Sequence, residues 1–94
     1  MFCDIEGTLL VGDKVNQEVL EKLKGFSEIK PVTLWSGGDL EELKKKLVAS
    51  GINYPLVSKD TFNGCKVEII MDDLDEDIFK REYETSFKEY IQIG

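Results

Sequence analysis

Short apolar runs alternate along the chain with longer stretches in which apolar residues recur every three or four positions. The runs are typical of buried β-strands, and the longer stretches are typical of amphipathic helices that cover a sheet. The predicted strands are Met1–Ile5, Val32–Trp35, a weaker Tyr54–Ser58, Val67–Met71 and a final edge strand over Glu89–Ile93. Strands that alternate with helices predict an α/β fold with a mostly parallel sheet.

Two helices are predicted between the first three strands. The first runs from about Asn16 to Lys24 and stops at Gly25. The second begins after Asp39, a typical N-cap residue, and runs to about Ser50. Their buried faces are expected at Val15, Val19, Leu20 and Leu23 in the first helix, and at Leu40, Leu43, Leu47 and Val48 in the second.

The remaining segments predict one more helix and two short connections. The acidic segment Asp72–Asp77 opens a short helix, which is expected to bury Ile78, Phe79 and Tyr83. Val11–Lys14, centred on Gly12-Asp13, predicts a tight turn or small hairpin. Asp60–Lys66 predicts a loop with a turn at Asn63-Gly64.

The bulk composition bounds the class of protein. A chain of 94 residues is expected to form one domain, residues 1–94. Its formal net charge of −7 argues against nucleic acid or an anionic membrane as a partner, and the lack of histidine excludes His-ligated zinc and any His-based triad. Cys3 and Cys65 have no CxxC spacing, and the sequence shows no signal peptide, so a reducing, cytoplasmic location is expected. A disulfide between them is the less favoured reading.

The first strand ends in a pattern that suggests chemistry. Asp4 and Glu6 lie two positions apart, and alternate residues of a strand share a face. If the strand continues to Glu6, both carboxylates point the same way. Gly7 then ends the strand and lets the backbone pass close to a bound group.

Similar polar groups follow the later strands. Ser36-Gly37-Gly38 follows the second strand, Lys59 the third and Asp72-Asp73 the fourth. In a parallel sheet these groups collect at one edge, where ligands bind. Carboxylates suit Mg²⁺, glycine amides at a helix start suit a phosphate oxygen, and lysine neutralises developing charge. The sequence therefore predicts a magnesium-assisted phosphoryl-transfer site.

These motifs, in this order, resemble those of the haloacid dehalogenase (HAD) superfamily. Asp4-Ile5-Glu6-Gly7-Thr8-Leu9 is similar to its first motif, Ser36-Gly37 to the second, Lys59 to the third, and Asp72-Asp73 with Asp77 to the fourth. The second acid of the first motif is usually Asp, but enolase-phosphatases of the superfamily also have Glu there. The resemblance implies a HAD-like Rossmannoid three-layer sandwich that is minimal and capless.

The resemblance also implies roles. Asp4 would be the nucleophile that forms an aspartyl phosphate, and Glu6 the general acid and base. Mg²⁺ would be held by Asp4, the Glu6 carbonyl and Asp73, with Asp72 or Asp77 in support. Ser36, the Gly37 amide and Lys59 would hold the phosphoryl oxygens of a small or macromolecular phosphorylated substrate.

The resemblance predicts the strand order 5-4-1-2-3, which makes the third connection demanding. Crossing two strands takes about 20–25 Å, and Asp60–Lys66 spans at most about 23–25 Å. We therefore expect this connection to run nearly straight without a helix, or the third strand to be misplaced.

Each motif also has a structural alternative. Asp4 and Glu6 could be surface acids, and Ser36 could be an ordinary loop residue. Lys66 competes with Lys59 as the site lysine. The acids of Asp72–Asp77 could simply be a solvated helix start.

Two rival functions remain open at this stage. The first is an interaction domain that has the fold with little or no activity. The second is a receiver-like phosphoacceptor domain, although receivers place the acid pair before the phosphoacceptor, and the order here is the reverse.

The short connections also bear on how the site is covered. Val11–Lys14 and Asp60–Lys66 are too short to form a cap, so Asp4 and Lys59 are expected to be open to water. Cover from a neighbouring subunit would compensate, which predicts a homo-oligomer with one of these two connections at the contact. The alternative is a monomer whose large substrate covers the site.

Overall fold

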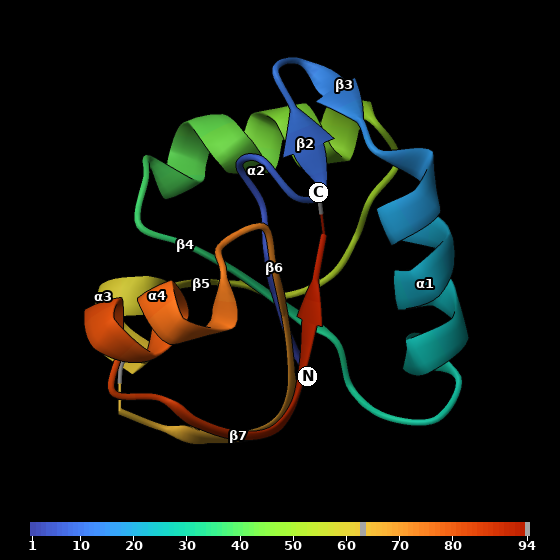
Figure 1. Cartoon of the computed structure of the whole chain (residues 1–94). Coiled ribbons are helices and arrows are strands. Elements are labelled where there is room, and N and C mark those ends of the chain that lie inside the picture. Colours follow the sequence, from blue (N-terminus) through green and yellow to red (C-terminus); the bar gives the residue numbers. More distant parts are fainter. Residues whose placement is uncertain (63, 94) are drawn as a thin grey trace.

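The computed structural model describes residues 1–62 and 64–93, so the Asn63 half of the predicted Asn63-Gly64 turn lies outside the described residues. Strands and helices alternate after an early hairpin (Figure 1). In chain order the elements are β1 (Phe2–Asp4), β2 (Leu10–Val11), β3 (Lys14–Val15), α1 (Gln17–Ser27), β4 (Thr33–Ser36), α2 (Leu40–Ala49), β5 (Leu56–Ser58), α3 (Lys59–Phe62), β6 (Lys66–Asp72), α4 (Glu76–Glu82) and β7 (Ser86–Gln92).

Five of these strands form one parallel sheet in the order β5-β4-β1-β6-β7. The predicted α/β class with a parallel sheet is therefore confirmed. Numbered along the chain, these five strands stand in the predicted order 5-4-1-2-3. The other two strands, β2 and β3, form the antiparallel hairpin predicted at Val11–Lys14.

The sheet separates two apolar clusters. Residues that alternate along a strand lie on opposite faces, so Cys3, Leu34 and Met71 share one face while Phe2 and Ile70 share the other. The first face packs against α1 and α2 through Val19, Leu23, Leu43 and Leu47. The second packs against Phe79 of α4. Helices on both faces make a three-layer arrangement (Figure 1).

The start of the first helix agrees with the prediction, and its end does not. Asn16 is the N-cap and its side chain accepts a hydrogen bond from the Val19 amide. Gly25 does not stop the helix, because the next residue, Phe26, packs on the first apolar cluster and α1 continues to Ser27.

Two predicted core residues are on the surface. Leu43 and Leu47 of α2 are buried, but Val48 is 64% exposed because it lies about 100° further round the helix than Leu47. Ile78 in α4 is 40% exposed, whereas its neighbour Phe79 is fully buried. Tyr83 is half-buried, but it follows the end of α4 and has an extended backbone.

The connection between β5 and β6 differs most from the prediction. A four-residue helix, α3, follows β5 directly, where the sequence predicts an extended chain. Figure 1 shows that β6 and β7 bend together, which brings the start of β6 back beneath α3 and α4. The predicted straight path without a helix is therefore wrong, and the third strand itself is where it was expected.

The two neighbours on α2 provide a test of the packing. Leu47→Ala should lower the free energy of unfolding by about 2–4 kcal/mol, because it leaves a cavity beneath α2. Val48→Ala should change it by less than about 0.5 kcal/mol, because an exposed side chain loses little contact. Urea denaturation of both variants measures this difference. Equal decreases in the free energy of unfolding would contradict the observed orientation of α2, with Leu47 toward the core and Val48 toward solvent.

Candidate functional site

Two carboxylates lie side by side at the carboxyl ends of neighbouring strands. The register pairs Phe2 with Ile70 and Cys3 with Met71, so Asp4 at the end of β1 aligns with Asp72 at the end of β6. Both side chains are buried, with Asp4 6% and Asp72 0% exposed. Two buried acids in this position require a compensating charge.

Lys59 supplies that charge. Its Nζ lies 2.8 Å from Asp4 Oδ1 and 3.3 Å from Asp72 Oδ2. The side chain is only 5% exposed and comes from the first residue of α3, directly after β5. Lys66, the competing candidate, is exposed at the start of β6. The structure therefore brings Lys59 to the acids.

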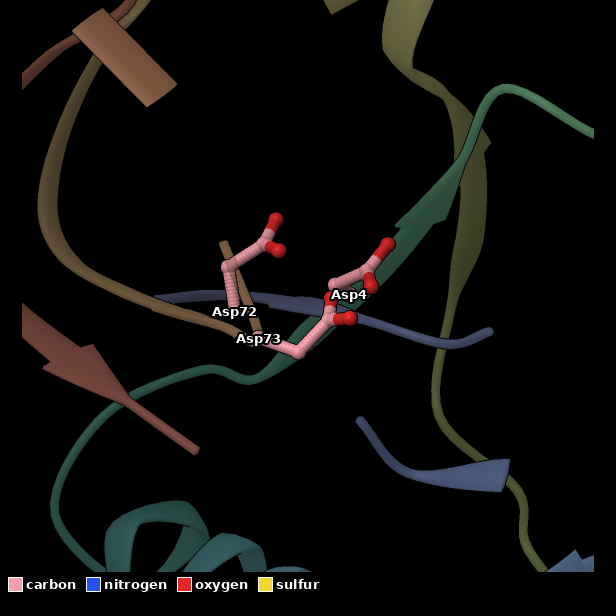
Figure 2. A group of neighbouring side chains, drawn as sticks. All are labelled: Asp4, Asp72 and Asp73. Carbon is pink, nitrogen blue, oxygen red and sulfur yellow. The ribbon is translucent and has the colours of Figure 1, made fainter. Parts of the chain in front are cut away.

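A third carboxylate and a hydroxyl complete the cluster. One oxygen from each of Asp4, Asp72 and Asp73 lies within 4.8 Å of the others. Figure 2 shows the three side chains as neighbours. The Thr8 hydroxyl lies 3.1 Å from Asp4 Oδ2 and 3.3 Å from Asp73 Oδ1, within reach to donate to either. Thr8 had no predicted role of its own, although its place after Gly7 in the first motif was the available signal.

Gly7 lets the chain pass close to this cluster. Its φ of +83° is in the region that favours glycine. A Cβ at this position would lie 2.6 Å from Asp73 Oδ2. A larger residue would therefore both strain the backbone and displace the Asp73 carboxylate.

The condition under which Glu6 would share a face with Asp4 is not met, because β1 does not continue to Glu6. The strand ends at Asp4, and the Ile5 carbonyl accepts hydrogen bonds from the amides of Thr8 and Leu10, which turns the chain. The exposed Glu6 carboxylate instead lies against Gly38, in the space that a Cβ there would fill. Glu6 thus joins the loop after β4 and lies outside the acid cluster.

Ser36 and the two glycines lie beside Glu6. Ser36 is buried, and its Oγ accepts a hydrogen bond of 3.0 Å from the Gly38 amide. Gly37 is exposed, with open space where a Cβ would be. Gly37 was the predicted phosphate-binding glycine, but Gly38 is the position where a Cβ would meet the flexible end of the Glu6 side chain.

A pocket of about 460 Å³ opens next to Glu6, between the β2–β3 hairpin and α2. Its lining includes Glu6, Gly7, Asp13, Glu42 and Lys46. Asp13 of the hairpin and Lys46 of α2 form an ion pair of 3.1 Å.

The proposed metal ligands are not all brought together. Asp77 lies in the first turn of α4, is exposed, and does not belong to the described group of three acids. Its amide donates instead to Asp75, the N-cap of α4. The structure therefore gives no support to the predicted supporting role of Asp77, and leaves Asp72 in that place.

The exposure expected of a capless site is also wrong for its buried half. Asp4 and Lys59 are 6% and 5% exposed, because α3, the strand ends and the second apolar cluster surround them. Glu6 and Asp73 are exposed. The physical reason for expecting a homo-oligomer is therefore weaker, and self-association stays a prediction.

Burial and charge set the protonation of the cluster. Burial, and then the neighbouring Asp72, raise the pKa of Asp4 to about 7, although Lys59 opposes this. Burial also raises the pKa of Asp72. Burial opposes ionisation of Asp73, but hydrogen bonds with Asp72, Asp4 and Thr8 outweigh it and lower its pKa. Burial likewise disfavours the Lys59 ammonium, but the carboxylates of Asp4 and Asp72 prevail and its pKa is raised.

This arrangement fits a divalent cation. Three carboxylates and one ammonium have a formal charge of −3 + 1 = −2 when all are ionised. Oxygens within 4.8 Å of one another are near the span of ligands around one magnesium ion, about 3–4 Å. The donor set is all oxygen, as Mg²⁺ prefers, and Asp73 is the exposed member through which an ion could enter.

Comparison of the chain with protein-family models, with curated proteins and with solved structures finds no match in any of the three. The function is therefore argued from the residues and geometry of this chain.

Within the described ranges, none of the helices combines the length and apolar character needed to cross a bilayer. Cys3 and Cys65 are both free thiols.

The pKa of Asp4 predicts a pH-dependent stability. The folded protein keeps a proton on Asp4 up to about pH 7, whereas the unfolded chain releases it near 3.8. The contribution of Asp4 to stability is therefore present at low pH and is lost as pH rises between these values. Asp4→Asn does not titrate at this position and serves as the reference. Relative to it, the free energy of unfolding of the wild type should fall by at most about 4 kcal/mol between pH 4 and pH 7 without metal. Denaturant melts of both proteins in EDTA measure this, and a gain with rising pH would show that Lys59 outweighs burial.

The acid cluster predicts stabilisation by magnesium. Magnesium at a concentration of about ten times its Kd should raise the free energy of unfolding by roughly 1.4 kcal/mol and the Tm by about 5–10 °C, because it binds only the folded state. Asp73→Asn should remove this response, whereas Asp60→Asn, which alters an exposed acid of α3, should keep it. Thermal melts with and without magnesium distinguish the two variants, and a response that survives Asp73→Asn would place the ion elsewhere.

Proposed function

We propose that this protein is a magnesium-dependent phosphatase that hydrolyses a phosphate monoester through an aspartyl phosphate on Asp4. The observation that carries the proposal is the buried Lys59 bound to Asp4 and Asp72, with Asp73 beside them, at the carboxyl edge of a parallel sheet. A protein gains little stability from burying such charges, so the cluster points to chemistry. The resemblance to the HAD superfamily supports the same assignment.

In this proposal Asp4 is the nucleophile. Lys59 and Thr8 contact different oxygens of its carboxylate, which fixes the orientation of the group. Asp4, Asp73 and the Glu6 carbonyl would hold Mg²⁺, with Asp72 in support. The ion would neutralise the charge of the phosphoryl group and bring it to Asp4.

The phosphoryl oxygens that do not contact Mg²⁺ would be held by donors of Lys59, Gly37 and Ser36. Lys59 would donate to one of them, and the amide of Gly37, an exposed residue in the loop after β4, would donate to another. The Ser36 Oγ accepts from the Gly38 amide, so its own proton is available to a phosphoryl oxygen. Together these donors would stabilise charge on the transferring group.

Glu6 would act on the leaving group. It is exposed and lines the pocket between the hairpin and α2, so the leaving alcohol would lie in that pocket. Glu6, in its protonated form, would give its proton to the leaving oxygen as the phosphorus–oxygen bond breaks, so that the alcohol departs. It would then take a proton from the water that cleaves the aspartyl phosphate and regenerates Asp4.

The nucleophile is tested with a generic aryl phosphate. Asp4→Asn should abolish magnesium-dependent hydrolysis, because an amide does not attack phosphorus, while the matched control Asp60→Asn keeps it. Equal activity of wild type and Asp4→Asn would contradict the mechanism. A pure wild type without any turnover would favour the interaction domain instead.

The role of Glu6 is tested by its isosteric amide. Glu6→Gln should slow turnover by about 10²–10⁴-fold, the usual contribution of a general acid and base, and let phosphoenzyme accumulate. Acid-quenched phosphoenzyme measured over time checks this. Wild-type turnover in Glu6→Gln would remove Glu6 from the mechanism, and a wild type that holds its phosphate would favour the receiver-like domain.

A further inference from the structure

The Lys59 ammonium has aromatic as well as acidic neighbours. Its Nζ lies 5.5 Å from the ring centroid of Trp35 and 5.0 Å from that of Tyr83. Trp35 comes from β4, and Tyr83 from the residue after α4. The two rings also contact each other, with centroids 6.1 Å apart. Lys59 therefore lies between two carboxylates and two rings.

The rings stabilise the ammonium in a way that the carboxylates do not. The face of an aromatic ring carries partial negative charge and attracts a cation within about 6 Å, most strongly where water is excluded. A ring face does not compete for the carboxylate oxygens. It can therefore hold Lys59 in place when other groups bind to Asp4.

The proposed reaction creates that situation. A metal ion and an incoming phosphoryl group both draw on the Asp4 carboxylate, which is one of the two acids that now fix Lys59. As those bonds weaken, the N–H groups of Lys59 become available to phosphoryl oxygens. An ammonium held by rings would stay in position through this exchange, whereas a free lysine chain would spread over several rotamers.

We propose that Tyr83, together with Trp35, is a positioning residue that holds the Lys59 ammonium against the acid cluster during turnover. This inference rests on the proposed phosphatase activity for its effect on rate. Its effect on the position of Lys59 does not depend on that activity. Tyr83 is the residue to test, because Trp35 is fully buried and its loss would damage the core.

The kinetic test compares three substitutions. Tyr83→Leu should lower kcat for an aryl phosphate by about 2- to 30-fold with little change in KM, the range that corresponds to about 0.5–2 kcal/mol of cation–π attraction at 1.36 kcal/mol per tenfold. Tyr83→Phe keeps the ring face and should stay within about twofold of wild type. Phe87→Leu removes a ring of the same aromatic cluster that faces Lys80, and should leave kcat unchanged.

A purely structural role of Tyr83 predicts a different result. Tyr83 also packs on Phe79, with ring centroids 5.0 Å apart, so Tyr83→Leu loses packing too. Fluorinated phenylalanines at position 83 keep the ring shape while they weaken its negative face. A stepwise fall of kcat with fluorination supports the proposal, and a constant kcat overturns it. This series also serves if Tyr83→Leu does not fold.

A spectroscopic test separates this inference from the proposed function. In protein labelled with ¹⁵N-lysine, ring currents should shift the Lys59 ammonium signal, which Lys59→Arg identifies by its loss. Tyr83→Phe should keep the shift, and Tyr83→Leu should reduce it. An unchanged signal in Tyr83→Leu overturns the proposal. A reduced shift in a protein without phosphatase activity supports the placement of Lys59 by Tyr83 and refutes only the proposed function.

Discussion

The buried ion pairs of Lys59 with Asp4 and Asp72 are the constraint on which the rest of the structure depends. Neighbouring parallel strands place the two carboxylates side by side, and burial makes each of them costly to ionise. Removing the lysine from such a group would leave uncompensated buried charge and would lower the free energy of unfolding by about 3–5 kcal/mol. The position of α3, and with it the path from β5 to β6, is therefore tied to the ends of β1 and β6.

The strand order explains how such distant residues meet. Asp4, Lys59 and Asp72 belong to segments that are far apart in the sequence, but parallel strands end at one edge of the sheet. The curvature of β6 allows a short connection to make the crossing and still place Lys59 over the acids (Figure 1). The same connection places Lys59 against Tyr83, in the second apolar cluster, which covers the face of the sheet that carries Phe2 and Ile70.

Features set by local sequence were predictable, and those set by packing were not. Apolar runs and the residues at their ends predicted the five main strands, the hairpin and the Asp39 cap. They also predicted the group of Asp4, Lys59 and Asp72. They did not predict the direction of Glu6, because the turn depends on which amides the Ile5 carbonyl accepts. The helical turn at Lys59 and the bend of β6 were not predicted either, because no local pattern of apolar residues encodes the path between two strands.

The site divides into a buried half and an open half, and this division bears on how a domain without a cap could work. Asp4 and Lys59 are shielded from water by the sheet edge, α3 and the aromatic rings, so their electrostatic interactions act in a low dielectric without a lid. Glu6 faces solvent beside an open pocket. In the proposed reaction, the phosphoryl group would meet the preorganised half while the alcohol remains near the surface. The size of the leaving group would then be limited by the open pocket and not by the buried half of the site.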